Sequence, residues 1–260
     1  MKSFDVVGSK EKAVAIVEIE EGEDEKKIVE EIMKSNKSVR SILKKTSERK
    51  GEFRTREHEL IAGDENTEVV HKEYGYLIKV DPQKVYFSPR EATERQRVAK
   101  QVKPKEIVML MFAGVGPFAV AISKKQPNVG KIIAVESNVD AVEYMKENIR
   151  INKIAHLVTA VLGNVEVACR KYFESCNRVI MPLPMGAERF LEIAIKCLKK
   201  DGGVVHFYNW GMEDDLYSNA MKQIEENAKK LNKKIKILGK RKVSAYAPGK
   251  WKICIDCLIK

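Results

Sequence analysis

A strand, a glycine-containing turn and a distal acid form the arrangement with the clearest chemical meaning in this sequence. The apolar run EIVMLM leads into FAGVGPF, where Gly114 and Gly116 allow a tight turn without a Cβ facing a ligand. Glu136 ends the next apolar run, IIAVE, about 20 residues later, where an acid accepts hydrogen bonds from both ribose hydroxyls of an adenine nucleoside. This spacing predicts a nucleoside-binding turn.

Two missing features narrow the identity of the nucleoside. Pro117, Phe118 and Ala119 follow Gly116, so the third glycine of the dinucleotide pattern is absent. The turn also lacks the Gly-Lys-Ser/Thr sequence of a P-loop. A turn without a pyrophosphate fingerprint suits a nucleoside without phosphates, and we expect S-adenosylmethionine. A purely structural strand-to-helix turn is the alternative.

Residues after two further strands lie where an open α/β sheet binds its ligand, beyond the carboxyl ends of the strands. Asn164 ends the third apolar strand, where it would either contact the adenine edge or cap the following helix. Pro182 and Pro184 follow the fourth strand and stiffen the chain there. The sequence favours neither the adenine contact nor the helix cap as the role of Asn164.

The elements that position these residues alternate from Ser88 onward. A helix beginning at Ser88 and Pro89 is followed by five apolar strands, each leading into a helix, the last helix running over about 214–232. Such alternation predicts a parallel, doubly wound α/β sheet. The C-terminal segment reads as two strands around a loop, which would close the sheet with a hairpin.

The first part of the chain has a different pattern. Within residues 5–20 the sequence AVAIVEIE alternates as a strand, 23–35 has helical spacing, and 38–44 is a short strand. Two β-rich segments, FRTREHELIAG and TEVVHKEYGYLIKVDP, follow. We therefore expect a small α+β domain at 1–84 and a cofactor-binding domain at 85–260.

The amino-acid composition favours nucleic acid as a partner, and the sequence contains no membrane-spanning or secretory segment. The 260 residues contain 48 Lys plus Arg against 37 Asp plus Glu, a net charge of +11, which favours a polyanion such as nucleic acid. A lysine-rich and glutamate-rich thermophile surface is the alternative. No apolar run is long enough to span a bilayer, and the N-terminus has no secretory apolar region.

The cysteines indicate a reducing compartment rather than a metal centre. Their number, 5, is odd in a chain without a secretory signal, so we expect reduced thiols and a cytoplasmic protein. Cys254 and Cys257 lie in an expected strand, where residues three apart point to opposite faces. We therefore expect core thiols and no metal site.

Eight stretches together resemble the archaeal and eukaryotic type tRNA (guanine-37-N1)-methyltransferases, which have the class I methyltransferase fold. They run in order along nearly the whole chain, and SPREATERQR with FAGVGPF is highly specific. The stretches are GEFRTRE (51–57), TEVVHKEYG (67–75), VYFSPREATERQRVA (85–99), FAGVGPF (112–118), ENIRIN (147–152), RVIMPLP (178–184), GGVVHFY (202–208) and YAPGKW (246–251). The aminocarboxypropyltransferases of wybutosine synthesis resemble the chain as well.

The resemblance implies a role for each matching residue. Glu94 matches the general base that removes the proton from guanine N1, and Arg54 matches the arginine that contacts O6. Such roles suit the chemistry, because N1 must lose a proton and O6 then gains negative charge. The family's cofactor contacts fall on Tyr86, Phe112, Ala113, Gly114, Val115, Gly116, Glu136, Ser137 and Leu183, and its RNA contacts on Arg90, Arg95, Pro182 and Pro184.

Without the resemblance, Glu94 reads as a helix-surface acid paired with Arg90 or Arg97, and Arg54 as a solvated charge. Three departures from the family pattern also stand out. Leu110 replaces an acid before the glycine turn, Asn164 replaces an acid, and Pro182 replaces the asparagine of an N-L-P motif. Proline offers neither an amide side chain nor an N–H to hold a target base.

These observations predict a Rossmann-like class I methyltransferase fold preceded by a small α+β domain. The expected activity is methyl transfer from S-adenosylmethionine to N1 of guanosine 37 in the tRNA anticodon loop. We expect the protein to be a monomer. The alternatives are a wybutosine-pathway transferase, adding an aminocarboxypropyl or methyl group at the same position, and a non-catalytic tRNA-binding paralogue. The resemblance also implies that the family's additional N-terminal domain is absent, since the chain starts at the second domain.

Overall fold

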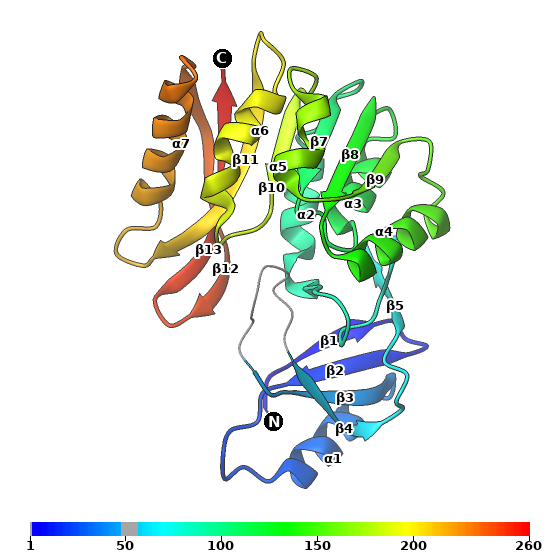
Figure 1. Cartoon of the computed structure of the whole chain (residues 1–260). Coiled ribbons are helices and arrows are strands. Elements are labelled where there is room, and N and C mark those ends of the chain that lie inside the picture. Colours follow the sequence, from blue (N-terminus) through cyan, green and yellow to red (C-terminus); the bar gives the residue numbers. More distant parts are fainter. Residues whose placement is uncertain (1, 48–56) are drawn as a thin grey trace.

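The computed structural model describes residues 2–47 and 57–260. Its larger part is a seven-stranded sheet of order β12-β13-β11-β10-β7-β8-β9 (Figure 1). The strands are β7 (Ile107–Met111), β8 (Lys131–Glu136), β9 (Val158–Leu162), β10 (Arg178–Met181), β11 (Gly203–Met212), β12 (Ile235–Ala247) and β13 (Lys250–Ile259). Strands β7 to β11 are parallel and β13 is antiparallel to β11, which confirms the expected sheet with a closing hairpin.

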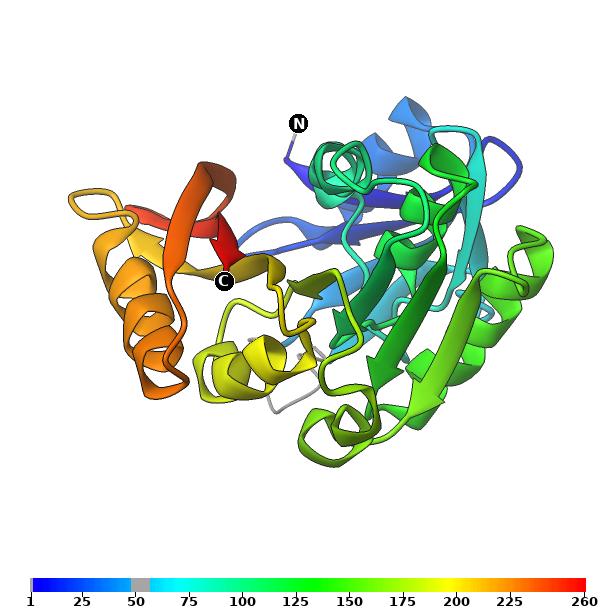
Figure 2. The ribbon, with the colours of Figure 1, turned by 90° about the horizontal axis from the view of Figure 1, so that it is seen from above.

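Helices cover both faces of this sheet (Figure 2). They are α2 (Ala92–Ala99), α3 (Pro117–Lys125), α4 (Val139–Ile151), α5 (Val165–Ala168), α6 (Leu191–Cys197) and α7 (Ser218–Lys230), with short 3₁₀ helices η1 (Pro89–Glu91), η2 (Arg170–Tyr172) and η3 (Ala187–Phe190). Successive residues of β7 point to opposite faces. Leu110 packs with α2, α3 and α4, whereas Met109 and Met111 pack with α5, α6 and α7.

Local sequence explains where the first helices after the strands begin. Gly116 has φ of +79°, a left-handed conformation that favours glycine, and Pro117 then occupies the first turn of α3. Asn138 caps α4 by accepting hydrogen bonds from the backbone N–H groups of Asp140 and Ala141. Both helices therefore start directly beside the ends of β7 and β8.

A second sheet of order β1-β2-β3-β4 lies at the other end of the molecule, with α1 beside it (Figure 1). Its elements are β1 (Phe4–Gly8), β2 (Ala13–Val17), α1 (Glu25–Ser35), β3 (Val39–Lys45) and β4 (His58–Gly63). The alternating segment at 5–20 is thus two strands, because the chain reverses between them. Gly8 permits this with φ of +136°, and a Cβ there would meet the Cα of Ala13 at 2.5 Å.

A separate hairpin links the two sheets in sequence and docks on α4. It consists of β5 (Val69–Glu73) and β6 (Tyr76–Val80). Asn148 of α4 accepts from the N–H of Lys79 at 2.6 Å, and Asn152 accepts from the N–H of Leu77 at 3.1 Å. The Asn148 amide also donates to the carbonyl of Val115 at 3.0 Å, so this buried side chain contacts both the hairpin and the glycine turn.

One apolar core runs through both parts of the molecule. Val14 and Leu43 of the small sheet belong to the same buried cluster as Val98, Phe118 and Tyr208 of the larger part. A second cluster fills the opposite face of the large sheet, and a third lies between the small sheet and α1. The small unit is therefore packed on the large one rather than merely tethered to it.

Two expected helices are shorter than the sequence pattern suggested. The helix expected from about 214 begins at Ser218, because a bridge between Met212 and Asp215 turns the chain first. The helix expected after Asn164 is a single α turn, α5, followed by η2. Within the described ranges, no helix combines the length and apolarity needed to cross a membrane.

Candidate active site

A cavity with about 850 Å³ of empty space, its open mouth included, lies beyond the carboxyl ends of β7, β8 and β10. It brings together the glycine turn, the segment before α2, the start of α4 and the start of β13. Its walls are Tyr86, Phe87, Ser88, Glu91, Arg95, Phe112, Ala113, Gly114, Val115, Pro117, Phe118, Glu136, Ser137, Asn138, Ala141, Pro182, Leu183 and Lys252.

The cavity collects most of the residues that the sequence singled out as cofactor contacts. Those lining it are Tyr86, Phe112, Ala113, Gly114, Val115, Glu136, Ser137 and Leu183, and two of the proposed RNA contacts, Arg95 and Pro182, line it as well. Residues from four separate stretches of sequence therefore meet in one place, as expected for an open α/β sheet.

Glu136 anchors the glycine turn. One carboxylate oxygen accepts from the N–H of Gly114 at 2.7 Å, and the other accepts from the N–H groups of Ser137 and Asn138, both at 2.9 Å. Oε2, which accepts one hydrogen bond, retains a lone pair for a ligand hydroxyl, whereas Oε1 already accepts two. A Cβ built on Gly114 would meet no atom within 4 Å, so this turn has room for a ligand where a side chain would stand. These features fit the ribose and sulfonium side of S-adenosylmethionine.

Phe112 places the start of this turn under backbone strain. Its φ is +53°, a left-handed conformation that costs a non-glycine residue free energy. The ring packs edge-on against Phe190, with centroids 5.2 Å apart. Packing against η3 thus stabilises the conformation that turns the backbone toward the cavity.

Other predicted site residues lie away from the cavity walls. Gly116 begins α3, and Pro184 is buried. Asn164 caps α5, accepting from the N–H of Glu166 at 2.7 Å, which is the helix-cap interpretation of that residue. Arg90 is exposed and pairs with Asp5. Arg54 lies outside the described residues.

Arg95 is held by an acid from the β5–β6 hairpin. Its side chain is 2% exposed, and it forms a bidentate ion pair with Glu73, in which Nε lies 2.9 Å from Oε1. It also donates to the carbonyl of Ser88 at 3.1 Å. Arg95 therefore braces the segment before α2 against the hairpin, in addition to lining the cavity.

Glu94 is buried and is engaged from two sides. Arg97 donates to both its oxygens at 2.8 Å, and the hydroxyl of Tyr208 donates to Oε1 at 2.5 Å. Burial raises the pKa of Tyr208 well above its usual range, so the phenol keeps its proton and remains a donor. Glu94 pairs with Arg97, as the sequence alternative proposed, but at a buried site rather than on the surface, and it is not a lining residue of the cavity.

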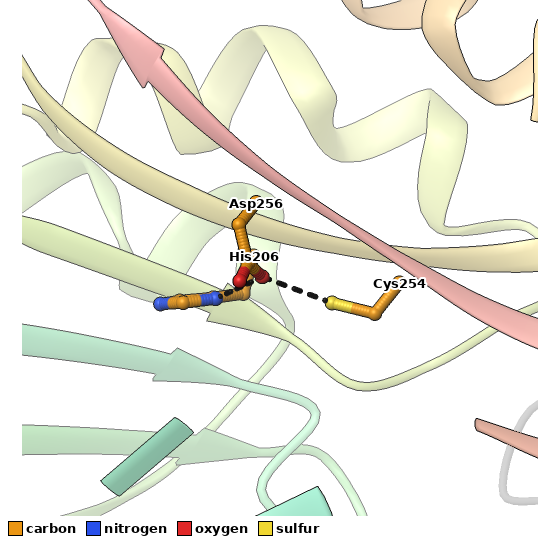
Figure 3. Close-up of side chains that lie close together, drawn as sticks. All are labelled: His206, Cys254 and Asp256. Carbon is orange, nitrogen blue, oxygen red and sulfur yellow. Dashed lines mark hydrogen bonds and ion pairs between the residues drawn. The ribbon is translucent and has the colours of Figure 1, made fainter. Parts of the chain in front are cut away.

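Behind Arg97 lies a cluster of His206, Cys254 and Asp256, shown in Figure 3. His206 Nδ1 donates to Asp256 at 2.7 Å, and Asp256 also pairs with Arg97. Burial opposes ionisation of Asp256, but the bonds from His206 and Arg97 outweigh it and hold the pKa of the carboxyl well below its usual range. Burial lowers the pKa of His206.

By residue type this cluster would suit a metal, but its polar atoms already have partners. The carboxylate of Asp256 accepts from Arg97, Gln101 and His206. His206 Nε2 lies 2.7 Å from a guanidinium nitrogen of Arg178. The guanidinium groups of half-buried Arg97 and buried Arg178 beside a divalent cation would repel it. We interpret the cluster as a hydrogen-bond network that joins α2 to β11 and β13.

The sequence reasoning missed several polar or aromatic residues of the cavity, among them Phe87, Ser88, Glu91, Asn138 and Lys252. Glu91 precedes Glu94 by one helical turn, and this spacing was a signal that the two acids lie on one face. Lys252 gave no such signal, because it belongs to a C-terminal strand whose position in the sheet the sequence did not fix.

Comparison with known proteins agrees with this geometry. Residues 69–238 match the TRM5/TYW2 methyltransferase domain, and residues 1–67 match the TYW2 N-terminal domain. The chain is 43% identical to tRNA (guanine(37)-N(1))-methyltransferase Trm5b of Pyrococcus abyssi over 98% of this chain and 74% of the relative.

Two further relatives represent both branches of the resemblance. The chain is 34% identical to tRNA(Phe) (4-demethylwyosine(37)-C(7)) aminocarboxypropyltransferase of Methanocaldococcus jannaschii over 94% of each chain. It matches the solved complex of aTrm5 with tRNALeu with a TM-score of 0.86 and 38% identity, over 99% of this chain and 72% of that one. The chain belongs to the TRM5/TYW2 family of class I S-adenosylmethionine-dependent methyltransferases.

Proposed function

We propose that this protein transfers a methyl group from S-adenosylmethionine to N1 of guanosine 37 in tRNA. The observation that carries the proposal is the cavity, in which the Glu136 and Gly114 turn shares one space with Pro182 and Leu183. The Trm5b relative at 43% identity, named for this reaction, supports the choice of substrate and product.

The chain's own residues would hold the cofactor at the glycine turn. Glu136 would accept hydrogen bonds from the ribose, and the backbone at Gly114 leaves space beside it. When bound, S-adenosylmethionine supplies a methyl group on a sulfonium, and the new bond to N1 forms as the sulfur–carbon bond breaks. Leu183 and Phe112 would exclude water from the reacting atoms.

The proton of N1 needs an acceptor, and we assign it to Glu94. Tyr208 and Arg97 fix the position of its carboxylate. Negative charge that develops on O6 would be stabilised by Arg54, and Arg90 would contact the RNA backbone through its exposed side chain. The net charge of +11 favours tRNA as the bound polyanion.

Replacement of Glu94 tests its role as the base. Glu94→Gln preserves shape and should lower turnover by about 10²-fold or more, the usual contribution of a general base, while tRNA affinity changes little. Glu166→Gln, at an exposed acid of α5 outside the cavity lining, serves as the comparison and should keep normal turnover. If Glu94→Gln keeps normal turnover, Glu94 is not the base.

The test of function uses a tRNA transcript with unmodified G37, S-adenosylmethionine and the purified protein, followed by nucleoside mass spectrometry. N1-methylguanosine is expected, and a G37→A transcript should yield none. A lack of product with retained tRNA binding would contradict the proposal and favour a non-catalytic paralogue.

A second candidate function is aminocarboxypropyl transfer to a wybutosine precursor at the same position. Two observations favour it: residues 1–67 match the TYW2 N-terminal domain, and the M. jannaschii aminocarboxypropyltransferase is 34% identical. The two reactions leave different groups on the RNA. Incubation with tRNA that contains 4-demethylwyosine should therefore add either a methyl or an aminocarboxypropyl mass, and 5′-methylthioadenosine would accompany only the latter.

We also infer a monomer in a reducing, cytoplasmic compartment. All five cysteines are buried free thiols, and burial raises the pKa of Cys257 to about 11. Such thiols are suited to a compartment where disulfides do not form. Size-exclusion chromatography with light scattering tests the monomer, and a mass near twice 29.6 kDa would contradict it.

A further inference from the structure

A buried ion pair between Lys252 and Glu91 forms part of the cavity wall. Lys252 Nζ lies 2.8 Å from Oε1 of Glu91, and the two side chains are 3% and 10% exposed. Lys252 comes from β13 and Glu91 from η1, so the pair joins the two edges of the cavity. Both residues face the same space as Pro182 and Gly114.

The ammonium of Lys252 has unused donor capacity. Its Nζ lies 5.0 Å from the centroid of the Tyr208 ring, whose π face attracts the positive charge. Among the described residues, the Lys252 ammonium donates a hydrogen bond only to Oε1 of Glu91. An ammonium carries three donors, so two are available to a ligand in the cavity. A buried cation with spare donors favours a ligand that offers acceptor oxygens or nitrogens.

The order of strands places this cation on the acceptor side of the reaction. Glu136 ends β8, the glycine turn follows β7, and Pro182 follows β10. Lys252 is paired with Trp210 of β11, still further along the same edge. A cofactor held by its ribose at Glu136 thus has Pro182 between that ribose and Lys252. The group that receives the methyl belongs at the Lys252 end.

The chemistry of the target base matches this position. We propose that Lys252 donates a hydrogen bond to O6 of the flipped guanine, and that Glu91 is the positioning residue that holds Lys252; this rests on the proposed function. When N1 loses its proton, charge spreads onto O6, where a fixed ammonium stabilises the transition state more than the ground state. Lys252 acts only as a hydrogen-bond donor, and no covalent bond to it forms or breaks.

The proposal also accounts for Pro182. Proline at this position supplies no side-chain amide and no N–H to the base. Lys252 reaches the same cavity from another strand and provides the missing donor. The recognition of the base would therefore be moved from the end of β10 to β13 in this chain.

The test compares Lys252→Met with Lys252→Arg, using the G37 transcript and the full chain. Lys252→Met should lower kcat by about 10²-fold, the typical effect of losing one donor to a developing oxyanion, with cofactor affinity unchanged. Lys252→Arg keeps a cationic donor and should recover part of the loss. Lys236→Met, an exposed lysine on β12, controls for charge and should behave like wild type.

A double variant controls for misfolding caused by an unpaired buried charge in the single variant. Glu91→Gln with Lys252→Gln replaces the ion pair by neutral groups and leaves no unpaired buried charge. It should bind S-adenosylhomocysteine normally by calorimetry and keep its circular-dichroism melt, yet lose kcat as Lys252→Met does. Wild-type turnover in this double variant would overturn the role of Lys252.

Other outcomes separate the remaining explanations. Weaker S-adenosylhomocysteine binding by Lys252→Met, with normal kcat at saturating cofactor, would show that Lys252 binds the methionine carboxylate instead and would overturn the proposal. Equal losses in Lys252→Met and Lys252→Arg would show a purely structural role. If the wild-type protein itself makes no N1-methylguanosine, the proposed function fails, and the role of Lys252 on guanine falls with it.

Discussion

The hydroxyl of Tyr208 donates to Oε1 of Glu94 across 2.5 Å, and both groups are buried. This contact fixes the orientation of a carboxylate that Arg97 already holds from the other side. Since Tyr208 comes from β11 and Glu94 from α2, the contact also joins the sheet to the helix that covers it.

Removing that hydroxyl should affect turnover more than folding. Tyr208→Phe keeps the ring under Lys252 but leaves Glu94 with one donor fewer, so we expect kcat to fall about tenfold and the unfolding free energy by about 1 kcal/mol. Steady-state kinetics and urea unfolding measure the two effects. Unchanged kcat in a folded Tyr208→Phe protein would show that the orientation of Glu94 does not matter to the reaction.

Glu136 should control cofactor affinity. Glu136→Gln removes the charge, turns one acceptor into a donor facing backbone N–H groups, and weakens hydrogen bonds to the ribose. We expect the Kd for S-adenosylhomocysteine to rise by about 10- to 100-fold, the range for losing a charge-assisted hydrogen bond. Calorimetric titration checks this. Glu166→Gln, on the exposed start of α5, is the matched control, and equal affinities in both variants would contradict the ribose role.

Acid should destabilise the protein through His206 and Asp256. The folded state lowers the pKa of both groups, from ordinary values of 6.5 and 3.8. The unfolded chain therefore binds more protons below those values, and stability falls as the pH drops, first below about 6.5 and again below about 4. Each unit of lowering contributes about 1.4 kcal/mol.

Thermal melts between pH 8 and pH 3 measure this dependence. The Asp256→Asn variant should be less stable at pH 7 and should lose the second, more acidic phase. A melting temperature that is constant from pH 8 to pH 5 would contradict the assignment of a neutral buried His206.

Asn148 should link the stability of the hairpin to cofactor binding. Its side chain is fully buried and bonds to Lys79 and Val115. Asn148→Leu leaves these backbone groups without partners, at a cost of about 1–3 kcal/mol for each buried group. We expect lower stability and a raised Kd for S-adenosylhomocysteine. Asn227→Leu, on α7, provides the comparison, and an unchanged Kd in Asn148→Leu would disprove the link.

Much of the fold could be predicted because its signals are local. The alternation of apolar runs and helices gave the parallel sheet, and Gly116, Pro117 and Asn138 marked helix starts through backbone preferences. The turn at Gly8 escaped detection because the strands on either side share one alternating pattern. The start of α7 was misplaced because a tertiary bridge at Met212 competes with helix propensity.

Some residues of the candidate site could also be identified from local sequence, and others depend on tertiary contacts. The glycine turn and Glu136 were identified because their spacing follows from one strand-turn-helix unit. Lys252 was missed because its place depends on the pairing of β13 with β11, which strand patterns alone do not specify. The burial of Glu94 also could not be read from the sequence, since it depends on Tyr208, 114 positions away.

The apolar core that includes Val14, Leu43 and Tyr208 has a consequence for how the chain folds. The N-terminal strands leave the ribosome long before β11 exists, so one side of their packing is unfinished during synthesis. We expect the whole chain to melt in a single calorimetric transition, with equal van't Hoff and calorimetric enthalpies. The small unit would then acquire its full stability only when the last strands of the sheet are in place.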